Sequence, residues 1–182
     1  MLIDGATQQA PQCSRQRITR RTARICAEEG IPYCHLLRPA WQPQPGDRWT
    51  LIADEAEAAD HIPPGSTVFL ATGRQTLLKF ANLSRCTLIC RQIDEATDSF
   101  PFPNGYFLIG RPPFSVQDEI ALFKELKIDW LVVKNAGGDA SATKLTAARA
   151  LGIPVAMIQR PAMPDAPRVS TVDEALTWVR SL

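Results

Sequence analysis

The sequence lacks any long apolar run, and this absence excludes whole classes of protein. No apolar stretch approaches the roughly 20 residues that a membrane-spanning helix needs. The first thirty residues are polar and rich in arginine, where a signal peptide would carry an apolar segment. We therefore expect a cytoplasmic protein with no membrane partner.

Metal-binding and disulfide motifs are also missing. The five cysteines contain no CxxC pair, and the only histidines are His35 and His61. A structural zinc site needs four closely placed cysteine or histidine ligands, so we expect no metal site. Cys34, Cys86 and Cys90 fall in apolar strand-like runs, which is typical of small buried side chains in a reducing compartment.

The composition is that of an ordinary globular chain. Of the 182 residues, 45% are hydrophobic and 21% are charged, and the net charge is +1. This length accommodates one sizeable core, or one domain and part of another. Fifteen of the twenty basic residues are arginine. Arginine binds carboxylates and phosphates with paired hydrogen bonds, so the excess is compatible with a polyanionic small ligand, although a GC-rich genome produces the same excess.

An arginine cluster near the start of the chain raises the alternative of a nucleic-acid partner. The chain as a whole is nearly neutral, and no nucleic-acid recognition motif accompanies the cluster. A solvated helix face explains the cluster better, so we expect no nucleic-acid partner. Its members are Arg15, Arg17, Arg20, Arg21 and Arg24.

The most informative stretch is IDWLVVKNAGG, residues 128–138. Its first half, up to Val133, is a short apolar run, which is typical of a strand buried on both faces of a parallel sheet. Lys134 ends this run. A turn of small residues follows, made of Asn135, Ala136, Gly137 and Gly138.

A helix is expected after this turn, from Ala140 to Leu151, with Asp139 or Ser141 as its cap. Backbone N–H groups in a glycine turn and the positive end of a helix dipole suit a phosphate, and Lys134 adds a full charge. The alternative is that the glycines only make a sharp turn, because the full GxGxxG and GxxxxGK[ST] spacings are absent.

Apolar runs of strand length alternate with helix-compatible segments along the chain, which predicts an α/β fold with a parallel sheet. Two helices carry clear start signals. Ser115 and Asp118 fit a capping box, as do Thr171 and Glu174. Strands are expected at 31–37, 49–52, 67–71, 87–90, 106–109, 128–133 and 154–158, with further helices at 18–29, 54–60 and 75–83.

The apolar spacing of the two capped helices predicts which face each one buries. The residues expected to be buried are Val116, Ile120 and Phe123 in the first helix, and Val172, Leu176 and Val179 in the last.

Cations follow five of the predicted strands. Parallel sheets collect their ligands at the carboxyl ends of the strands, so these side chains predict an anion-binding edge. The residues at the strand ends are Thr72, Gly73 and Arg74, Arg91, Gly110 and Arg111, Lys134 and Asn135, and Arg160.

A proline-rich segment between Arg38 and Asp47 is the most linker-like part of the chain. We place a boundary there, with residues 1–44 as one partial α/β unit and its linker, and residues 45–182 as the main domain. Met1–Gly5 is expected to be the end of a strand.

Several motifs in order resemble the precorrin-6A reductase family of cobalamin biosynthesis. The motifs are TGRQ at 72–75, GRPPF at 110–114, IDWLVVKNAGG at 128–138 and its continuation to Pro161, with GIPYCHLLRPAW at 30–41 upstream. The resemblance covers nearly everything from Ile18 onward. It implies Rossmann-like domains and an amino-terminally truncated chain, because the family's Asp-Ala-Thr-His-Pro motif is represented here only by Asp4, Ala6 and Thr7.

The resemblance also implies an NADPH-dependent oxidoreductase that reduces a double bond of precorrin-6A, a tetrapyrrole fringed with carboxylates. Because the hydride chemistry belongs to NADPH, no protein nucleophile is required. The alternative is a non-catalytic binder of NADPH or tetrapyrrole. We assign NADPH to Thr72, Gly73, Arg74 and the stretch from Lys134 through Asn135, Ala136, Gly137 and Gly138, and the substrate to Arg91, Arg111 and Arg160. The four arginines all remain candidates for the 2′-phosphate as well as for the substrate carboxylates.

Overall fold

The computed structural model describes residues 14–94 and 98–182, without the side chains of residues 14–17 and 140. The chain divides into two compact units. The larger unit spans Pro39–Arg160, and the smaller unit combines the residues up to Arg38 with Pro161–Leu182. The strand expected at Met1–Gly5, with the Asp4 to Thr7 motif, lies outside the described residues.

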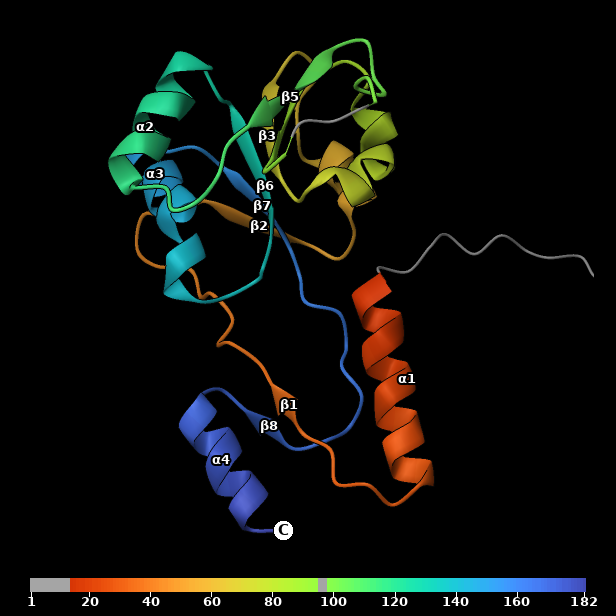
Figure 1. Ribbon diagram of the computed structural model, residues 1–182. Coiled ribbons are helices and arrows are strands. Elements are labelled where there is room, and N and C mark those ends of the chain that lie inside the picture. The colour runs from red at the N-terminus through yellow and green to blue at the C-terminus, as the bar shows by residue number, and fades with distance from the viewer. Residues whose placement is uncertain (1–13, 95–97) are drawn as a thin grey trace, which may run out of the picture. The chain divides into compact units, whose positions relative to one another are not determined.

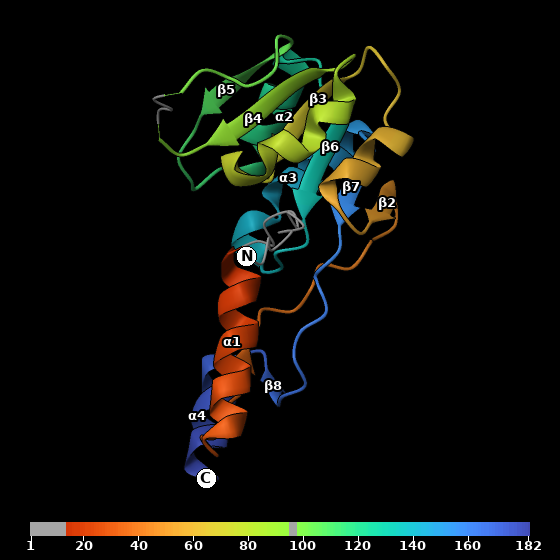
Figure 2. The same cartoon turned by 90° about the vertical axis from the view of Figure 1, so that its right-hand side faces the viewer.

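The larger unit contains a six-stranded sheet in which every strand runs parallel to its neighbours (Figure 2). The expectation of an α/β fold with a Rossmann-like parallel sheet is therefore confirmed. The spatial order is β2 (Trp49–Ile52), β7 (Val155–Ile158), β6 (Trp130–Lys134), β3 (Thr67–Ala71), β4 (Thr87–Gln92) and β5 (Gly105–Ile109).

Helices cover both faces of this sheet (Figure 1). The 3-10 helices η1 (Glu55–Asp60) and η2 (Arg74–Leu83) pack on one face, where Leu77 and Phe80 join the core. The α-helices α2 (Val116–Glu125) and α3 (Thr143–Leu151) pack on the other face through Phe123 and Leu145. The result is a three-layer sandwich around the sheet.

The central strands form because their sequences are apolar on both sides of the pleat. Val68, Phe69 and Leu70 of β3 are each 0% exposed, as are Leu131 and Val132 of β6. Successive side chains of a strand point to opposite faces, so such runs fit only a sheet that is covered on both sides.

The predicted helix starts are confirmed at two places and wrong at a third. Both capping boxes form, at Ser115 before α2 and at Thr171 before α4. The helix expected from Ala140 instead begins as the short 3-10 helix η3 (Asp139–Ser141), and α3 starts at Thr143. Neither Asp139 nor Ser141 caps α3, because Ala142 occupies the cap position without a side-chain bond.

The smaller unit is a parallel pair of short strands with two helices (Figure 1). Strand β1 (His35–Leu36) pairs with β8 (Arg168–Val169), and the helices are α1 (Ser14–Glu28) and α4 (Val172–Arg180). This pairing differs from the predicted division at residues 44 and 45. The segment from Pro161 groups with the amino-terminal part because β8 supplies the partner strand of β1.

The predicted burial of the last helix is wrong. Val172, Leu176 and Val179 are 64%, 48% and 56% exposed. Periodicity shows that α4 has an apolar face, but burial also requires another element against that face. Within the described part of the chain, no helix combines the length and the apolar character needed to cross a membrane.

Candidate functional site

The order of the strands creates a switch point between β3 and β6, which are neighbours at the centre of the sheet. After β3 the chain enters η2 on one face and continues to β4, whereas after β6 it enters α3 on the opposite face and continues to β7. Two loops that diverge in this way leave room for a ligand beyond the carboxyl ends of the strands.

The two diverging loops contain residues 72–74 and 134–138, which we predicted from the sequence to bind NADPH. Ala71 and Val133 are partners in the register of β3 and β6, so Thr72 and Lys134 follow at the same level of the sheet. Because the whole sheet is parallel, the ends of β3, β5 and β6 lie at one edge, as predicted.

The turn after β6, Asn135–Gly138, is called here the edge turn. Gly137 and Gly138 have φ values of 70° and 82°, a region that side chains other than glycine rarely adopt. A Cβ on Gly137 would also collide with the carbonyl oxygen of Pro39 and the guanidinium of Arg160. Glycine at position 137 is therefore required by both the backbone conformation and the close approach of the neighbouring chain.

Arg160 lies at the edge turn, where two of its nitrogens donate to backbone carbonyls. Its Nε donates to the carbonyl of Asn135 at 2.8 Å, and a terminal nitrogen donates to the carbonyl of Ala136 at 2.9 Å. These bonds fix the conformation of the turn. We predicted a substrate contact for Arg160, and in the structure its guanidinium also holds two backbone carbonyls of the edge turn.

Trp41 contacts the same turn from another part of the chain. Its backbone N–H donates to Oδ1 of Asn135 at 2.9 Å, and Nδ2 of Asn135 donates to the Trp41 carbonyl at 3.0 Å. The indole Nε1 of Trp41 donates to the carbonyl of Gly138 at 2.9 Å. The sequence singled out Asn135 and Gly138 but gave no sign that Trp41 would contact them.

Lys134 belongs to a network of four charges. Its Nζ lies 3.1 Å from Oε1 of Glu55 and 3.3 Å from the hydroxyl of Thr76. Nζ of Lys79 lies 2.9 Å from the other Glu55 oxygen and 2.9 Å from Oδ2 of Asp54. The side chain of Lys134 remains 37% exposed, so a ligand can reach it from solvent.

Glu55 is the buried centre of this network, with only 6% of its side chain exposed. Burial alone would raise the pKa of its carboxyl, but hydrogen bonds from Lys79 and Lys134 outweigh that effect and hold the pKa below its usual value. Hydrogen bonds from Glu55 and Asp54 in turn raise the pKa of Lys79.

The loop after β3 is open toward solvent. Gly73 has φ of 76° and a Cβ placed on it would meet nothing within 4 Å. Arg74 follows at the start of η2 and is exposed. The hydroxyl oxygen of Thr72 is buried and has no hydrogen-bond partner among the described residues, which leaves a polar atom of this loop unsatisfied.

The two remaining cations at the edge differ sharply in exposure. Arg91 is 8% exposed and forms an ion pair with Glu119, which is 1% exposed, so its charge is committed within the fold. Arg111 is 74% exposed and lies 2.7 Å from the equally exposed Asp94. The predicted substrate contact therefore suits Arg111 better than Arg91.

An open parallel sheet with helices on both faces, and with a glycine turn and a lysine at its switch point, defines a Rossmann-like α/β protein. Comparison with known proteins identifies the particular family. Residues 15–180 match the family model described as "Precorrin-6x reductase CbiJ/CobK".

Curated relatives and a solved structure agree with this match. The chain is 45% identical to "Precorrin-6A reductase" of Rhodococcus erythropolis, over 91% of this chain and 67% of the relative. It is 37% identical to the protein of the same name from Rhodobacter capsulatus, over 98% of this chain and 69% of the relative. The structure named "CobK precorrin-6A reductase" superposes with a TM-score of 0.88 at 34% identity, over 92% of this chain and 69% of that one.

The chain belongs to the precorrin-6x reductase CbiJ/CobK family. The expectation of an oxidoreductase of cobalamin biosynthesis is thereby confirmed. The chain spans about two thirds of the length of the curated relatives it matches.

Proposed function

We propose that this chain reduces precorrin-6A with NADPH, and that the pyrophosphate of NADPH binds at the edge turn beside Lys134. The observation that carries the proposal is the position of Thr72–Arg74 and Lys134–Gly138 on the two loops that diverge at the switch point. Ligands of open parallel sheets bind at such points.

The groups at this point fit a dinucleotide phosphate. The amides of Gly137 and Asp139 have no acceptor among the described residues, whereas the carbonyls of Ala136 and Gly138 are already bonded to Arg160 and Trp41. The turn is thus rich in available donors and poor in available acceptors, which suits an anion. The unsatisfied hydroxyl of Thr72 adds a further polar group on the facing loop.

The two exposed arginines take separate roles in the proposal. Arg74 follows the loop at the switch point and suits the 2′-phosphate of NADPH, since a guanidinium can bind a phosphate with paired hydrogen bonds. Arg111, at the end of the outermost strand, suits a carboxylate of the tetrapyrrole. When bound, NADPH supplies the hydride that reduces the substrate double bond. The residues of this edge hold and orient the cofactor.

The test is NADPH oxidation with precorrin-6A supplied, in the chain as it stands and in Lys134→Ala. Losing a charge-assisted hydrogen bond costs about 1–3 kcal/mol, so KM for NADPH should rise about tenfold. Lys124→Ala, which removes an exposed lysine at the end of α2, is the matched control and should leave KM unchanged.

Three outcomes separate the alternatives. An unchanged KM in Lys134→Ala would contradict phosphate binding at the edge turn. NADPH binding without turnover of precorrin-6A would support the non-catalytic binder instead. Turnover with a selective loss in Lys134→Ala would support the proposal in full.

A further inference from the structure

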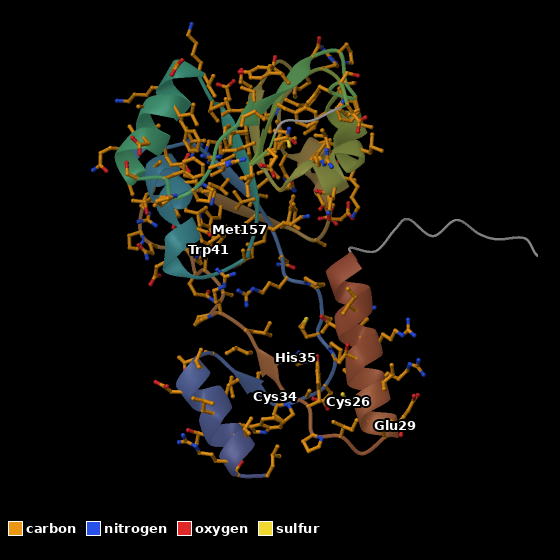
Figure 3. All side chains as sticks on the ribbon, viewed as in Figure 1. Cys26, Glu29, Cys34, His35, Trp41 and Met157 are labelled. Carbon is orange, nitrogen blue, oxygen red and sulfur yellow. The ribbon has the colours of Figure 1, made fainter. Side chains whose placement is uncertain are left out.

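We propose that Trp41 is a positioning residue for the edge turn, holding it in the one conformation that directs its free amides toward the ligand. The inference rests on the proposed function, because it assigns a role to Trp41 in binding the NADPH pyrophosphate at that turn. Figure 3 labels Trp41, which precedes β2 in the larger unit.

The first support is the paired contact between Asn135 and the backbone of Trp41. One amide group both accepts from the Trp41 N–H and donates to the Trp41 carbonyl. Only a side chain with a donor and an acceptor in this geometry can make both bonds. The backbone N–H of Asn135 meanwhile donates to the Ile158 carbonyl at 2.9 Å, so Trp41 is tied to an extension of the sheet.

The second support is the direction of the peptide groups in the turn. In a trans peptide the carbonyl and the following N–H point in opposite directions. The indole of Trp41 holds the carbonyl of Gly138, so the N–H of Asp139 must point away from Trp41. Arg160 holds the carbonyl of Ala136 in the same way, so the N–H of Gly137 points away from Arg160.

Trp41 and Arg160 therefore each turn one amide of the turn outward. Arg160 has three donor nitrogens and also holds Asn135, whereas the indole offers a single N–H. Removing that N–H releases the Gly138 carbonyl and lets the peptide between Gly138 and Asp139 rotate. The loss of this hydrogen bond should therefore lower the affinity of the turn for its ligand more than it lowers the stability of the protein.

Packing around the indole should keep the ring in place when the N–H is removed, because Trp41 packs against the core of the larger unit. The ammonium of Lys144, in the first turn of α3, lies 5.8 Å from the centre of the Trp41 ring. Desolvation by burial lowers the pKa of Lys144, as expected for an ammonium enclosed beside the ring. A phenylalanine at position 41 would retain the ring face and lose only the donor.

The larger unit contains a matched control for this change. Trp41 and Trp49 line the same groove, which has a volume of about 420 Å³. The Nε1 of Trp49 is buried and has no hydrogen-bond partner within the described residues, whereas Nε1 of Trp41 is bonded to Gly138. Trp49→Phe therefore deletes an indole N–H from the same groove without releasing any carbonyl.

The experiment compares Trp41→Phe with Trp49→Phe in the full chain. We expect Trp41→Phe to lower the affinity for NADPH and for inorganic pyrophosphate about fivefold, the effect of roughly one neutral hydrogen bond. KM for NADPH should rise while kcat at saturating NADPH stays within about twofold. Amide hydrogen exchange at Gly138 and Asp139 should accelerate in the free Trp41→Phe protein and stay unchanged in Trp49→Phe.

The outcomes distinguish this inference from the proposed function. Wild-type pyrophosphate affinity in Trp41→Phe, with a clear loss in Lys134→Ala, would overturn the role of Trp41 and leave the site standing. Equal losses in Trp41→Phe and Trp49→Phe would show that the groove acts through packing and would also overturn it. Unchanged pyrophosphate affinity in Trp41→Phe and Lys134→Ala alike would overturn the site itself, and the inference with it.

Discussion

Arg91 and Glu119 form a buried ion pair between β4 and α2. A terminal nitrogen of Arg91 lies 2.8 Å from each carboxylate oxygen of Glu119. The guanidinium also lies 4.8 Å from the ring centre of Phe69 and 4.2 Å from that of Phe114. A charge enclosed in this way fixes α2 to the sheet, and it explains why a strand-end cation need not meet a ligand.

Breaking this pair should destabilise the protein strongly. Glu119→Ala leaves a guanidinium buried without its partner, which costs about 3–5 kcal/mol of unfolding free energy. Asp94→Ala is the control, because it removes the partner of Arg111 from a pair whose side chains are 74% and 76% exposed. Such exposed pairs contribute about 0–1 kcal/mol. Urea unfolding measures both, and similar losses in the two variants would contradict the structural role of Arg91.

We predict that an alanine substitution has different effects at two glycines with nearly the same φ, one of them in the edge turn. Gly137 has φ of 70° and Gly152, after α3, has φ of 65°. An alanine in this region costs about 1–2 kcal/mol for conformation alone. Gly152→Ala should cost no more, since nothing lies within 4 Å of its added Cβ.

Gly137→Ala should cost more than this and should also abolish NADPH binding. Its Cβ would collide with the Pro39 carbonyl and with Arg160, so the turn has to move. Unfolding free energies and NADPH fluorescence titrations of Gly137→Ala and Gly152→Ala provide the comparison. A Gly137→Ala protein that binds NADPH as tightly as Gly152→Ala would show that the turn does not hold the phosphate.

The sequence predicted the sheet well because its signals are local. A run such as Thr67–Ala71, bounded by turn residues, has few alternatives to a buried strand. The capping boxes at Ser115 and Thr171 are similarly local, and both form. The predicted start of α3 was wrong because Asp139 and Ser141, although residue types that favour a helix cap, lie within the short 3-10 helix η3.

The partners of the edge cations could not be predicted, because they lie far away in sequence. Glu119 is 28 positions from Arg91, and Trp41 is 94 positions from Asn135. Nothing in either local pattern specifies these pairs. Two acceptors of Arg160 are the backbone carbonyls of Asn135 and Ala136, and a carbonyl leaves no residue-specific signal in the sequence.

The network around Glu55 predicts a dependence of stability on pH. The pKa of Glu55 in the folded protein lies below its ordinary value of 4.5. A carboxyl with a lowered pKa contributes stability that is complete above the unfolded value and is lost as pH falls through the folded one. The stability of the native chain should therefore decline as pH falls below about 4.5.

Glu55→Gln isolates this contribution. The native chain should exceed Glu55→Gln in unfolding free energy by a constant amount above about pH 5.5, and this excess should shrink below about pH 4.5. Asp54 also has a lowered pKa, chiefly through a backbone hydrogen bond from Ala56, but it titrates in both proteins and largely cancels. Urea unfolding across this range checks the prediction, which an excess independent of pH would contradict.

The last prediction concerns the choice between NADPH and NADH, which differ only in the 2′-phosphate. Arg74 is exposed directly after Gly73 at the switch point, whereas Arg91 is buried with Glu119 and Arg160 holds the edge turn. Arg74→Ala should therefore weaken the binding of NADPH by about 1.5–3 kcal/mol, the range for hydrogen bonds to charged groups. The affinity for NADH should stay unchanged.

Arg111→Ala is the matched variant for this test, because it removes an arginine that is also exposed at the carboxyl edge but follows the outermost strand, β5. It should preserve the ratio of NADPH to NADH affinity and raise KM for precorrin-6A, since the proposal assigns Arg111 to the substrate and not to the cofactor. Fluorescence titrations with both nucleotides measure the ratio in each variant. Equal ratios in Arg74→Ala and the native chain would remove Arg74 from the cofactor site, and a fall in the ratio in Arg111→Ala would transfer the 2′-phosphate to the end of β5.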